Sequence, residues 1–184
     1  MNEVTPHLSA VLDADWRRLL EFSQEPIKPR RWSSSFSPRF ACVALIRLSR
    51  YWHLKKWQRL SKFVSFVNFV VFGIEVTPRL VIGPGLVIPH SHGTVIGAGY
   101  IGANVTIFQQ VTLGAKLANF QFDASARPYV CDGVIITSGA KVLGPVRLGE
   151  GAVVGANAVV ISDVPPYHNA VGVPARMVPQ QQPG

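Results

Sequence analysis

Two histidines, His90 and His92, stand two positions apart in the segment PHSHG. An imidazole titrates near neutral pH, so a histidine can take the proton from a hydroxyl that attacks a carbonyl carbon. Neutral imidazole is also a zinc ligand, and alternate residues of a tight turn can share one metal ion. A catalytic zinc takes about three protein ligands, and no third histidine is near in the sequence. A general base is therefore the main hypothesis, and metal analysis of the purified protein would test for zinc.

The residues around this pair follow a six-residue repeat. Late in the chain, one aliphatic residue recurs at every sixth position: Val130, Ile136, Val142, Leu148, Val154 and Val160. A period of six fits neither a helix nor a simple strand, and it is typical of a parallel β-helix, in which each unit is a short strand and a turn. An earlier and less regular series takes the same inward role: Ile82, Ile88, Ile96, Ile101, Ile107 and Leu113.

The repeat fails at places where chemistry is expected. The step from Ile88 to Ile96 contains two extra residues, and they fall at the histidines. The period is then lost between Leu113 and Val130, so residues 115–128 are expected to loop out of the coil. Long loops on repeat scaffolds are commonly functional. The sequence therefore predicts a site near His90 and this loop.

The chain before the repeat is predicted to be helical. Residues 8–22 form one amphipathic pattern, and residues 39–60 read as a second helix. Residues 63–72 are almost wholly apolar but too few to span a bilayer as a helix, and Gly73 ends this part. We therefore expect a helical region at 1–73, a β-helix at 74–178 and a tail at 179–184.

The formal net charge of +8 belongs to the front of the chain, because residues 28–62 hold ten Lys or Arg and no acidic residue. One interpretation is a helical cap on the β-helix or on a neighbouring subunit. The other is a helix lying on an anionic membrane. No nucleic-acid partner is expected, since no recognised binding module accompanies the charges. Two cysteines and a polar N-terminus predict a cytoplasmic protein, with peripheral contact at the inner membrane face as the alternative.

Residues 73–178 resemble the hexapeptide-repeat acyltransferases, and within them the serine O-acetyltransferase-like branch. The matching segments are GIEVTP (73–78), PHSHG (89–93), TIFQQVTLG (106–114), VIITSGAKVLG (134–144) and VPPYHNAVGVPARMV (164–178). The resemblance implies a mainly β fold, a left-handed parallel β-helix, assembled into homotrimers. It also implies an acetyltransferase that binds acetyl-CoA in the groove between neighbouring subunits, with no metal.

The resemblance assigns roles residue by residue. His90 matches the general base, Glu75 matches a family carboxylate that could partner it, and His92 lines the substrate pocket. Six positions match the acetyl-CoA site, four of them small residues and two of them cations that would meet CoA phosphates: Gly114, Ala115, Ser138, Ala156, Lys141 and Arg176.

Three positions depart from the pattern of true serine acetyltransferases. There an aspartate precedes the catalytic histidine, and an Arg-His pair in the loop contacts the amino acid; here the residues are Pro89, Ala126 and Arg127. Arg127 is therefore expected either to orient the acceptor or to anchor its loop.

These departures argue against serine as the acceptor. The N-terminal helices also resemble those of exopolysaccharide and capsule acetyltransferases. We therefore expect acetyl transfer to a sugar or glycolipid hydroxyl in polysaccharide biosynthesis. Serine O-acetylation for cysteine biosynthesis is the alternative within enzymes. An inactive scaffold that binds a partner or membrane through its basic helices is the alternative outside them.

Overall fold

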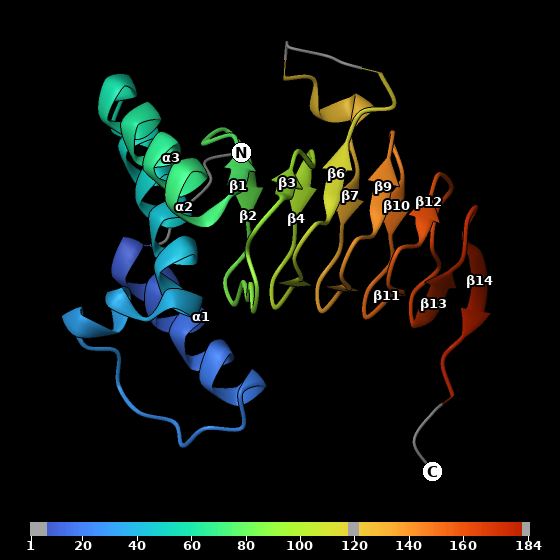
Figure 1. Ribbon diagram of the computed structural model, residues 1–184, viewed down its shortest axis with the longest axis horizontal. Coiled ribbons are helices and arrows are strands. Elements are labelled where there is room, and N and C mark those ends of the chain that lie inside the picture. The colour runs from blue at the N-terminus through green and yellow to red at the C-terminus, as the bar shows by residue number, and fades with distance from the viewer. Residues whose placement is uncertain (1–6, 118–121, 182–184) are drawn as a thin grey trace.

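A helical region packs against one end of a β-helix in the computed structural model, which describes residues 7–117 and 122–181 (Figure 1). The helices are α1 (Leu8–Phe22), the 3-10 helix η1 (Trp32–Phe36), α2 (Pro38–Leu54) and α3 (Gln58–Phe72). The strands are β1 (Ile74–Val76), β2 (Val81–Ile82), β3 (Thr94–Ile96), β4 (Tyr100–Ile101), β5 (Thr106–Ile107), β6 (Thr112–Gly114), β7 (Tyr129–Val130), β8 (Ile135–Ile136), β9 (Lys141–Leu143), β10 (Arg147–Leu148), β11 (Val153–Val154), β12 (Val159–Val160), β13 (His168–Val171) and β14 (Arg176–Pro179).

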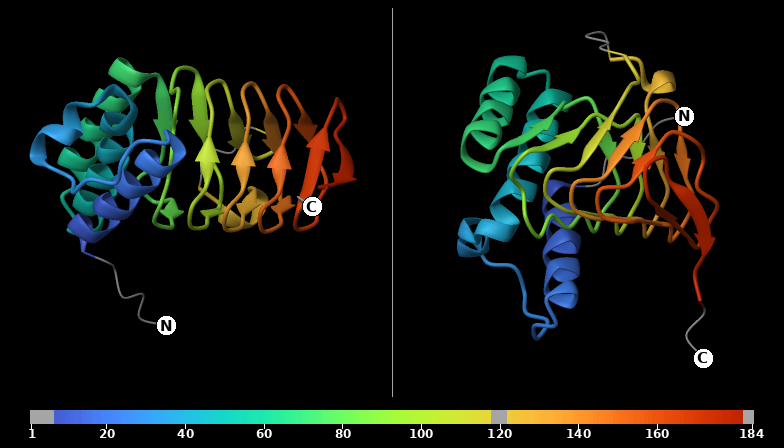
Figure 2. Two further views of the ribbon diagram at one scale, coloured as in Figure 1. Left: turned by 90° about the horizontal axis from the view of Figure 1, so that it is seen from below. Right: turned by 45° about the vertical axis from the view of Figure 1, so that its right-hand side comes forward.

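Successive strands enter three different sheets, which makes the coil (Figure 2). The first sheet runs β1-β3-β6-β9-β12, the second β2-β4-β7-β10, and the third β5-β8-β11-β13-β14. Every pair of strands is parallel except β13 with β14 at the end of the chain. The predicted mainly β fold, a parallel β-helix preceded by helices, is confirmed.

The inward positions of the repeat form the core of the coil. All six residues of the late series are fully buried, and the six of the earlier series are at most 8% exposed. They stack from coil to coil, because Ile96 pairs with Leu113, Leu113 with Val142, and Val142 with Val160. The irregular steps of the front half therefore change the turns and leave the inward column intact.

One turn shows why the repeat needs glycine. Gly139 has a φ of +74°, where a side chain is strained. A Cβ at this position would also collide with Oδ1 of Asn157 in the next coil. Stacked turns therefore restrict each other's side chains.

The predicted helix at 39–60 is wrong in its boundaries. α2 ends at Leu54, Lys56 takes a left-handed φ of +64°, and α3 starts at Gln58. No glycine or proline marks this turn, so the sequence lacked the usual signal. The helix at 8–22 is confirmed as α1. None of the helices within the described ranges combines the length and apolar character that crossing a bilayer requires.

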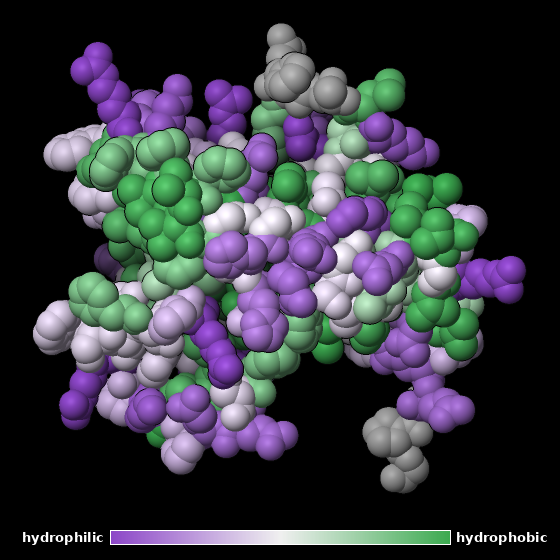
Figure 3. Space-filling model, viewed as in Figure 1, coloured by the Kyte–Doolittle hydropathy of each residue, from purple (hydrophilic) through white to green (hydrophobic). Residues whose placement is uncertain are grey.

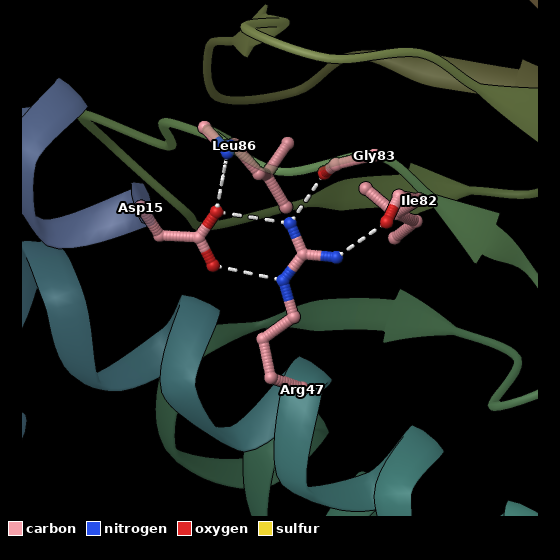
Figure 4. Close-up of polar contacts among 6 residues, drawn as sticks. Asp15, Arg47, Ile82, Gly83 and Leu86 are labelled. Atoms are coloured by element: carbon pink, nitrogen blue, oxygen red, sulfur yellow. Dashed lines mark hydrogen bonds and ion pairs between the residues drawn. The ribbon is translucent and has the colours of Figure 1, made fainter. Parts of the chain in front are cut away.

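A buried ion pair joins the helices to the first coil (Figure 4). Asp15 of α1 is fully buried, and both its oxygens accept hydrogen bonds from Arg47 of α2 at 2.8 and 2.9 Å. The same guanidinium donates to the carbonyls of Ile82 and Gly83 at 2.7 and 2.6 Å. Asp15 also accepts the amides of Gly85 and Leu86 at 2.8 and 2.9 Å. We call this network the Asp15–Arg47 clamp.

Candidate active site

A groove of about 560 Å³ runs along the outer face of the first sheet and under the loop that follows β6. Four predicted site residues line it: Glu75, Gly114, Ala115 and Arg127. Arg79, Thr112, Lys116 and Phe122 are among its other lining residues. The groove thus brings the Glu75 carboxylate, the guanidinium groups of Arg79 and Arg127, the Lys116 ammonium and the two small residues assigned to the cofactor into a single space.

Arg127 is held at the end of the loop. A short 3-10 helix, η2 (Ala124–Ala126), precedes it, and the Asp123 side chain caps this helix. The hydroxyl and amide of Ser125 donate to Asp123 and lower the pKa of its carboxyl below the ordinary value. Arg127 Nη1 donates to the Gly97 carbonyl at 3.0 Å, and its guanidinium lies 5.0 Å from the Phe122 ring centre. The cation is therefore positioned by contacts on both sides.

Gly97 is a residue whose role the sequence did not assign. A Cβ there would approach the Leu113 carbonyl oxygen at 2.7 Å and Arg127 Nη1 at 3.0 Å. Only glycine at position 97 leaves room for the Arg127 guanidinium to reach the Gly97 carbonyl. The signal was present, since the repeat is one residue short between Ile96 and Ile101.

Glu75 projects from the strand that begins the coil. It is exposed, and it pairs in register with Val95 of β3. Two residues earlier, Gly73 ends α3 with a φ of +64°, and a Cβ there would lie 3.2 Å from the backbone of His92 and Gly93. The close approach at Gly73 therefore brings the histidine turn against the start of the strand that carries Glu75.

The two histidines themselves lie on the turn before β3. Both are exposed, and neither lines the groove. His92 Nδ1 lies 3.5 Å from the Ser91 hydroxyl, and its carbonyl accepts the amide of Gln110 at 3.1 Å. Within the described residues, His90 and Glu75 share no hydrogen bond or ion pair. The structure places the expected base on the turn before β3 and its expected partner on the neighbouring strand β1, without a hydrogen bond or ion pair between them.

Two of the residues assigned to acetyl-CoA belong to the same column of turns as the histidines. The Gly139 amide donates to Gln109, and the Asn157 amide donates to the Ser138 carbonyl at 2.9 Å. Ser138 and Ala156 therefore lie in successive coils, in the same column of stacked turns as His92. Ala156 is exposed and Ser138 is half-buried.

The two cations assigned to CoA phosphates differ in position. Lys141 of β9 reaches back to this column, where its Nζ donates to the Gln110 carbonyl at 2.5 Å. Arg176 is exposed in β14, at the far end of the coil from the histidines. Lys141 therefore lies beside the column of turns that holds Ser138 and Ala156, whereas Arg176 lies apart from this column.

The side chains of residues 7–117 and 122–181 contain no cluster of three His, Cys, Asp or Glu that could hold a metal ion.

A parallel β-helix with this groove defines the class of protein as a hexapeptide-repeat transferase. No family model matches the chain. Among known proteins, the serine acetyltransferase of Helicobacter pylori is 32% identical over 170 residues, which are 91% of this chain and 98% of that protein. The serine acetyltransferase of Mycobacterium tuberculosis is 41% identical over 132 residues, 69% of this chain and 56% of that protein. The chain thus spans about half the length of several relatives and almost all of another.

Solved structures give the same result. The crystal structure of serine acetyltransferase from Neisseria gonorrhoeae has a TM-score of 0.83 at 29% identity, covering 98% of this chain and 70% of that one. A serine acetyltransferase in complex with CoA has a TM-score of 0.79 at 29% identity, covering 95% and 71%. The chain belongs to the serine acetyltransferase family.

The expected sugar or glycolipid acceptor, with its exopolysaccharide pathway, is wrong. The relatives at 32% and 41% identity are serine acetyltransferases, which was the alternative. The error came from giving decisive weight to Pro89, Ala126 and Arg127 against a similarity that covers most of the chain. The Arg127 guanidinium lines the same groove as the Glu75 carboxylate even though Ala126 replaces the expected arginine.

Proposed function

We propose that this protein is a serine O-acetyltransferase, which transfers the acetyl group of acetyl-CoA to the hydroxyl of serine, as in cysteine biosynthesis. Membership of the family is the first support. The observation that carries the proposal is the groove that joins Arg127 and Glu75 to Gly114 and Ala115. The lining of this groove offers charged side chains for an amino acid and small residues for a pantetheine arm.

His90 acts as the general base in this proposal. It takes the proton of the serine hydroxyl as the oxygen forms its bond to the thioester carbonyl carbon. The carbon–sulfur bond then breaks, and the proton passes from His90 to the CoA sulfur. The products are O-acetylserine and CoA as the free thiol. The exposure of His90 supports this role, because substrates must reach the base.

Arg127 binds the serine carboxylate in this proposal. A guanidinium and a carboxylate form charge-assisted hydrogen bonds, roughly twice as strong as neutral ones. The contact with Gly97 and the packing on Phe122 fix the guanidinium in the groove wall, which reduces the entropy lost on binding. Glu75 is free to accept a hydrogen bond from the serine ammonium or to orient His90.

The site is completed in a homotrimer in this proposal, and the coil is left-handed, as in the family. His90 and the groove lie on different edges of the first sheet in one chain. A neighbouring subunit that packs beside this sheet would bring its histidine turn toward the groove. Acetyl-CoA then lies between two subunits, with Ser138, Lys141 and Ala156 along its path, and with Arg176 for a phosphate. His92 lines the acceptor side.

Acceptor-dependent release of CoA tests the proposal. Purified protein is incubated with acetyl-CoA and millimolar serine, and free thiol is measured with a thiol-reactive dye. O-Methylserine is the matched control, because it keeps the carboxylate and ammonium but lacks the attacking hydroxyl. Release that depends on serine and is absent with O-methylserine supports the proposal. No serine-dependent release at millimolar serine, the upper end of ordinary KM values, overturns it.

Three variants separate the assigned roles. His90→Ala should lower kcat by about 10²–10⁴ while CoA affinity is kept, and His92→Ala should lower it less than tenfold. Arg127→Gln should instead raise the KM for serine at least about tenfold, because a carboxylate contact is lost. Equal kcat in the wild type and the His90→Ala variant would show that His90 is not the base.

A further inference from the structure

Helix α3 buries polar side chains and exposes large apolar ones. Its most buried positions include Ser61 and Asn68, which are at most 1% exposed. Its outward positions are large and apolar: Phe63, Phe66, Phe69, Val70 and Val71 are 54–62% exposed. Figure 3 shows hydrophobic side chains gathered over this helix. An amphipathic helix on a protein in water normally has the opposite arrangement.

Hydrogen bonds to α2 explain why the polar side faces inward. The Ser61 hydroxyl donates to the Ser49 carbonyl at 2.8 Å, and the Ser49 hydroxyl donates to the Ser61 carbonyl at 3.0 Å. Asn68 Nδ2 donates to the Cys42 carbonyl at 3.2 Å. Small polar residues let the two helices approach closely, which is how helices associate in lipid. The phenylalanines of α3 therefore stay exposed in the part of the chain that the structure describes.

Basic residues lie on the same side of α3 as the phenylalanines. Arg59 and Lys62 precede Phe63 and Phe66 by one helical turn each, so the four side chains share one helical face. All four are exposed. We call Arg59, Lys62, Phe63, Phe66 and Val70 the α3 outer surface.

The surroundings of this surface carry the same two features. Lys55 and Lys56 are exposed at the turn before α3. Trp57 follows them, 61% exposed and stacked on Trp52 at 5.2 Å between ring centres. No acidic residue occurs between Glu25 and Glu75. Tryptophan and long basic side chains are typical of segments at the boundary between lipid and water.

We propose that the α3 outer surface docks on a membrane of anionic lipid, with the phenylalanines among the upper acyl chains and the basic residues at the phosphates. The charge decides between this occupant and a second copy of the chain. A second copy of this surface would offer no acidic side chain to Arg59 and Lys62, because no acidic residue occurs between Glu25 and Glu75. An anionic lipid surface instead attracts each basic side chain that lies near it. The contact is peripheral, since α3 is only 15 residues long.

Sedimentation with lipid vesicles tests the proposal on the full chain. Vesicles of phosphatidylcholine with phosphatidylglycerol are compared with vesicles of phosphatidylcholine alone. The wild type should sediment with the anionic vesicles, less at high salt, and should stay in solution with the neutral ones. Arg59→Glu with Lys62→Glu should weaken vesicle binding by at least about 25-fold, since one basic residue near an anionic surface strengthens binding about fivefold. Phe63→Ser with Phe66→Ser should weaken it by at least about tenfold.

Matched controls keep the change in charge or apolarity but move it elsewhere. Arg17→Glu with Lys28→Glu changes the net charge equally, and Ile27→Ser with Ile161→Ser removes exposed apolar side chains outside α3. Both should sediment within about twofold of the wild type. Failure of the wild type to bind anionic vesicles, or equal losses in the control variants, would overturn the proposal. A change of oligomeric state on size-exclusion chromatography by the α3 variants, without vesicle binding by the wild type, would assign the surface to a second copy instead.

Discussion

The β-helix and helix α3 use apolar residues in opposite ways. In the coil, every sixth residue is aliphatic and buried, and the turns between are small or polar. In α3, serine and asparagine are buried, whereas phenylalanine and valine face outward. A coil buries its own side chains, because each turn stacks on the next. A helix has no interior, so its apolar face always depends on a neighbour. The coil therefore buries its own apolar column, whereas the outward apolar side chains of α3 stay exposed within the chain.

The largest effect is expected where the two regions join. Arg47→Met leaves Asp15 as a buried carboxylate without its cation, which should lower the free energy of unfolding by about 3–5 kcal/mol. Chemical denaturation followed by tryptophan fluorescence measures this, since Trp16 lies next to Asp15. The control is Arg17→Met, which removes an exposed pair with Glu21 and should cost less than about 1 kcal/mol. Equal losses would show that the clamp does not couple the helices to the coil.

A change within the wall of the coil tests the regular side of the comparison. Ile136 is fully buried, and Ile136→Ala should cost about 2–5 kcal/mol through lost burial and a cavity. Ile161→Ala makes the same change at a half-exposed position and should cost under about 1 kcal/mol. The same denaturation curves measure both. If the two variants were equally stable, the inward column would not be the main source of stability.

Gly139 and Gly133 have similar positive φ values, so substitutions at the two positions separate the cost of backbone strain from the cost of a steric collision. Gly139→Ala combines a φ of +74° with a collision at Asn157, and it should cost about 2–4 kcal/mol. Gly133→Ala has a φ of +68°, but its Cβ would meet nothing closer than 3.8 Å, so it should cost about 1 kcal/mol. Thermal denaturation of the pair measures the difference. A reversed order would contradict the stacking of turns described above.

The smallest effect is expected on the outer surface of α3. Phe66→Ser removes a side chain that is 61% exposed, so the free energy of unfolding should change by no more than about 0.5 kcal/mol. The same change at the buried Phe40 should cost about 3–5 kcal/mol. Denaturation in the absence of lipid measures both. A large loss at Phe66 would mean that this residue stabilises the fold rather than an external contact.

The coil could be predicted from the sequence because each six-residue unit obeys a local rule. The six residues of the late series, which runs from Val130 to Val160 at every sixth position, were assigned inward positions from spacing alone. All six are fully buried. The helix boundary at Lys56 could not be predicted, because neither a glycine nor a proline marks its left-handed backbone. The inverted polarity of α3 was also hidden, since it depends on hydrogen bonds between Ser49 and Ser61, twelve residues apart.

The residues of the candidate site could be proposed from the sequence one by one, but their arrangement could not. Glu75, His90 and Arg127 were identified by resemblance to a family, each from its own short segment. Their relative positions depend on how the turns stack, which places Arg127 with Glu75 and leaves His90 on another edge. The acceptor prediction failed for a related reason, because it treated three substitutions as independent evidence without knowing that Arg127 supplies a cation to the same groove.

The Asp15–Arg47 clamp also fixes a direction. Four hydrogen bonds with Asp15 and Arg47 tie α1 and α2 to the backbone between Ile82 and Leu86, so these two helices are held in one orientation to the first coil. If α3 rests on a bilayer, the coil axis keeps a constant tilt, and each coil adds about 4.8 Å along that axis. The histidine turn near the first coil and Arg176 in the last coil would then lie at two fixed distances from the lipid surface.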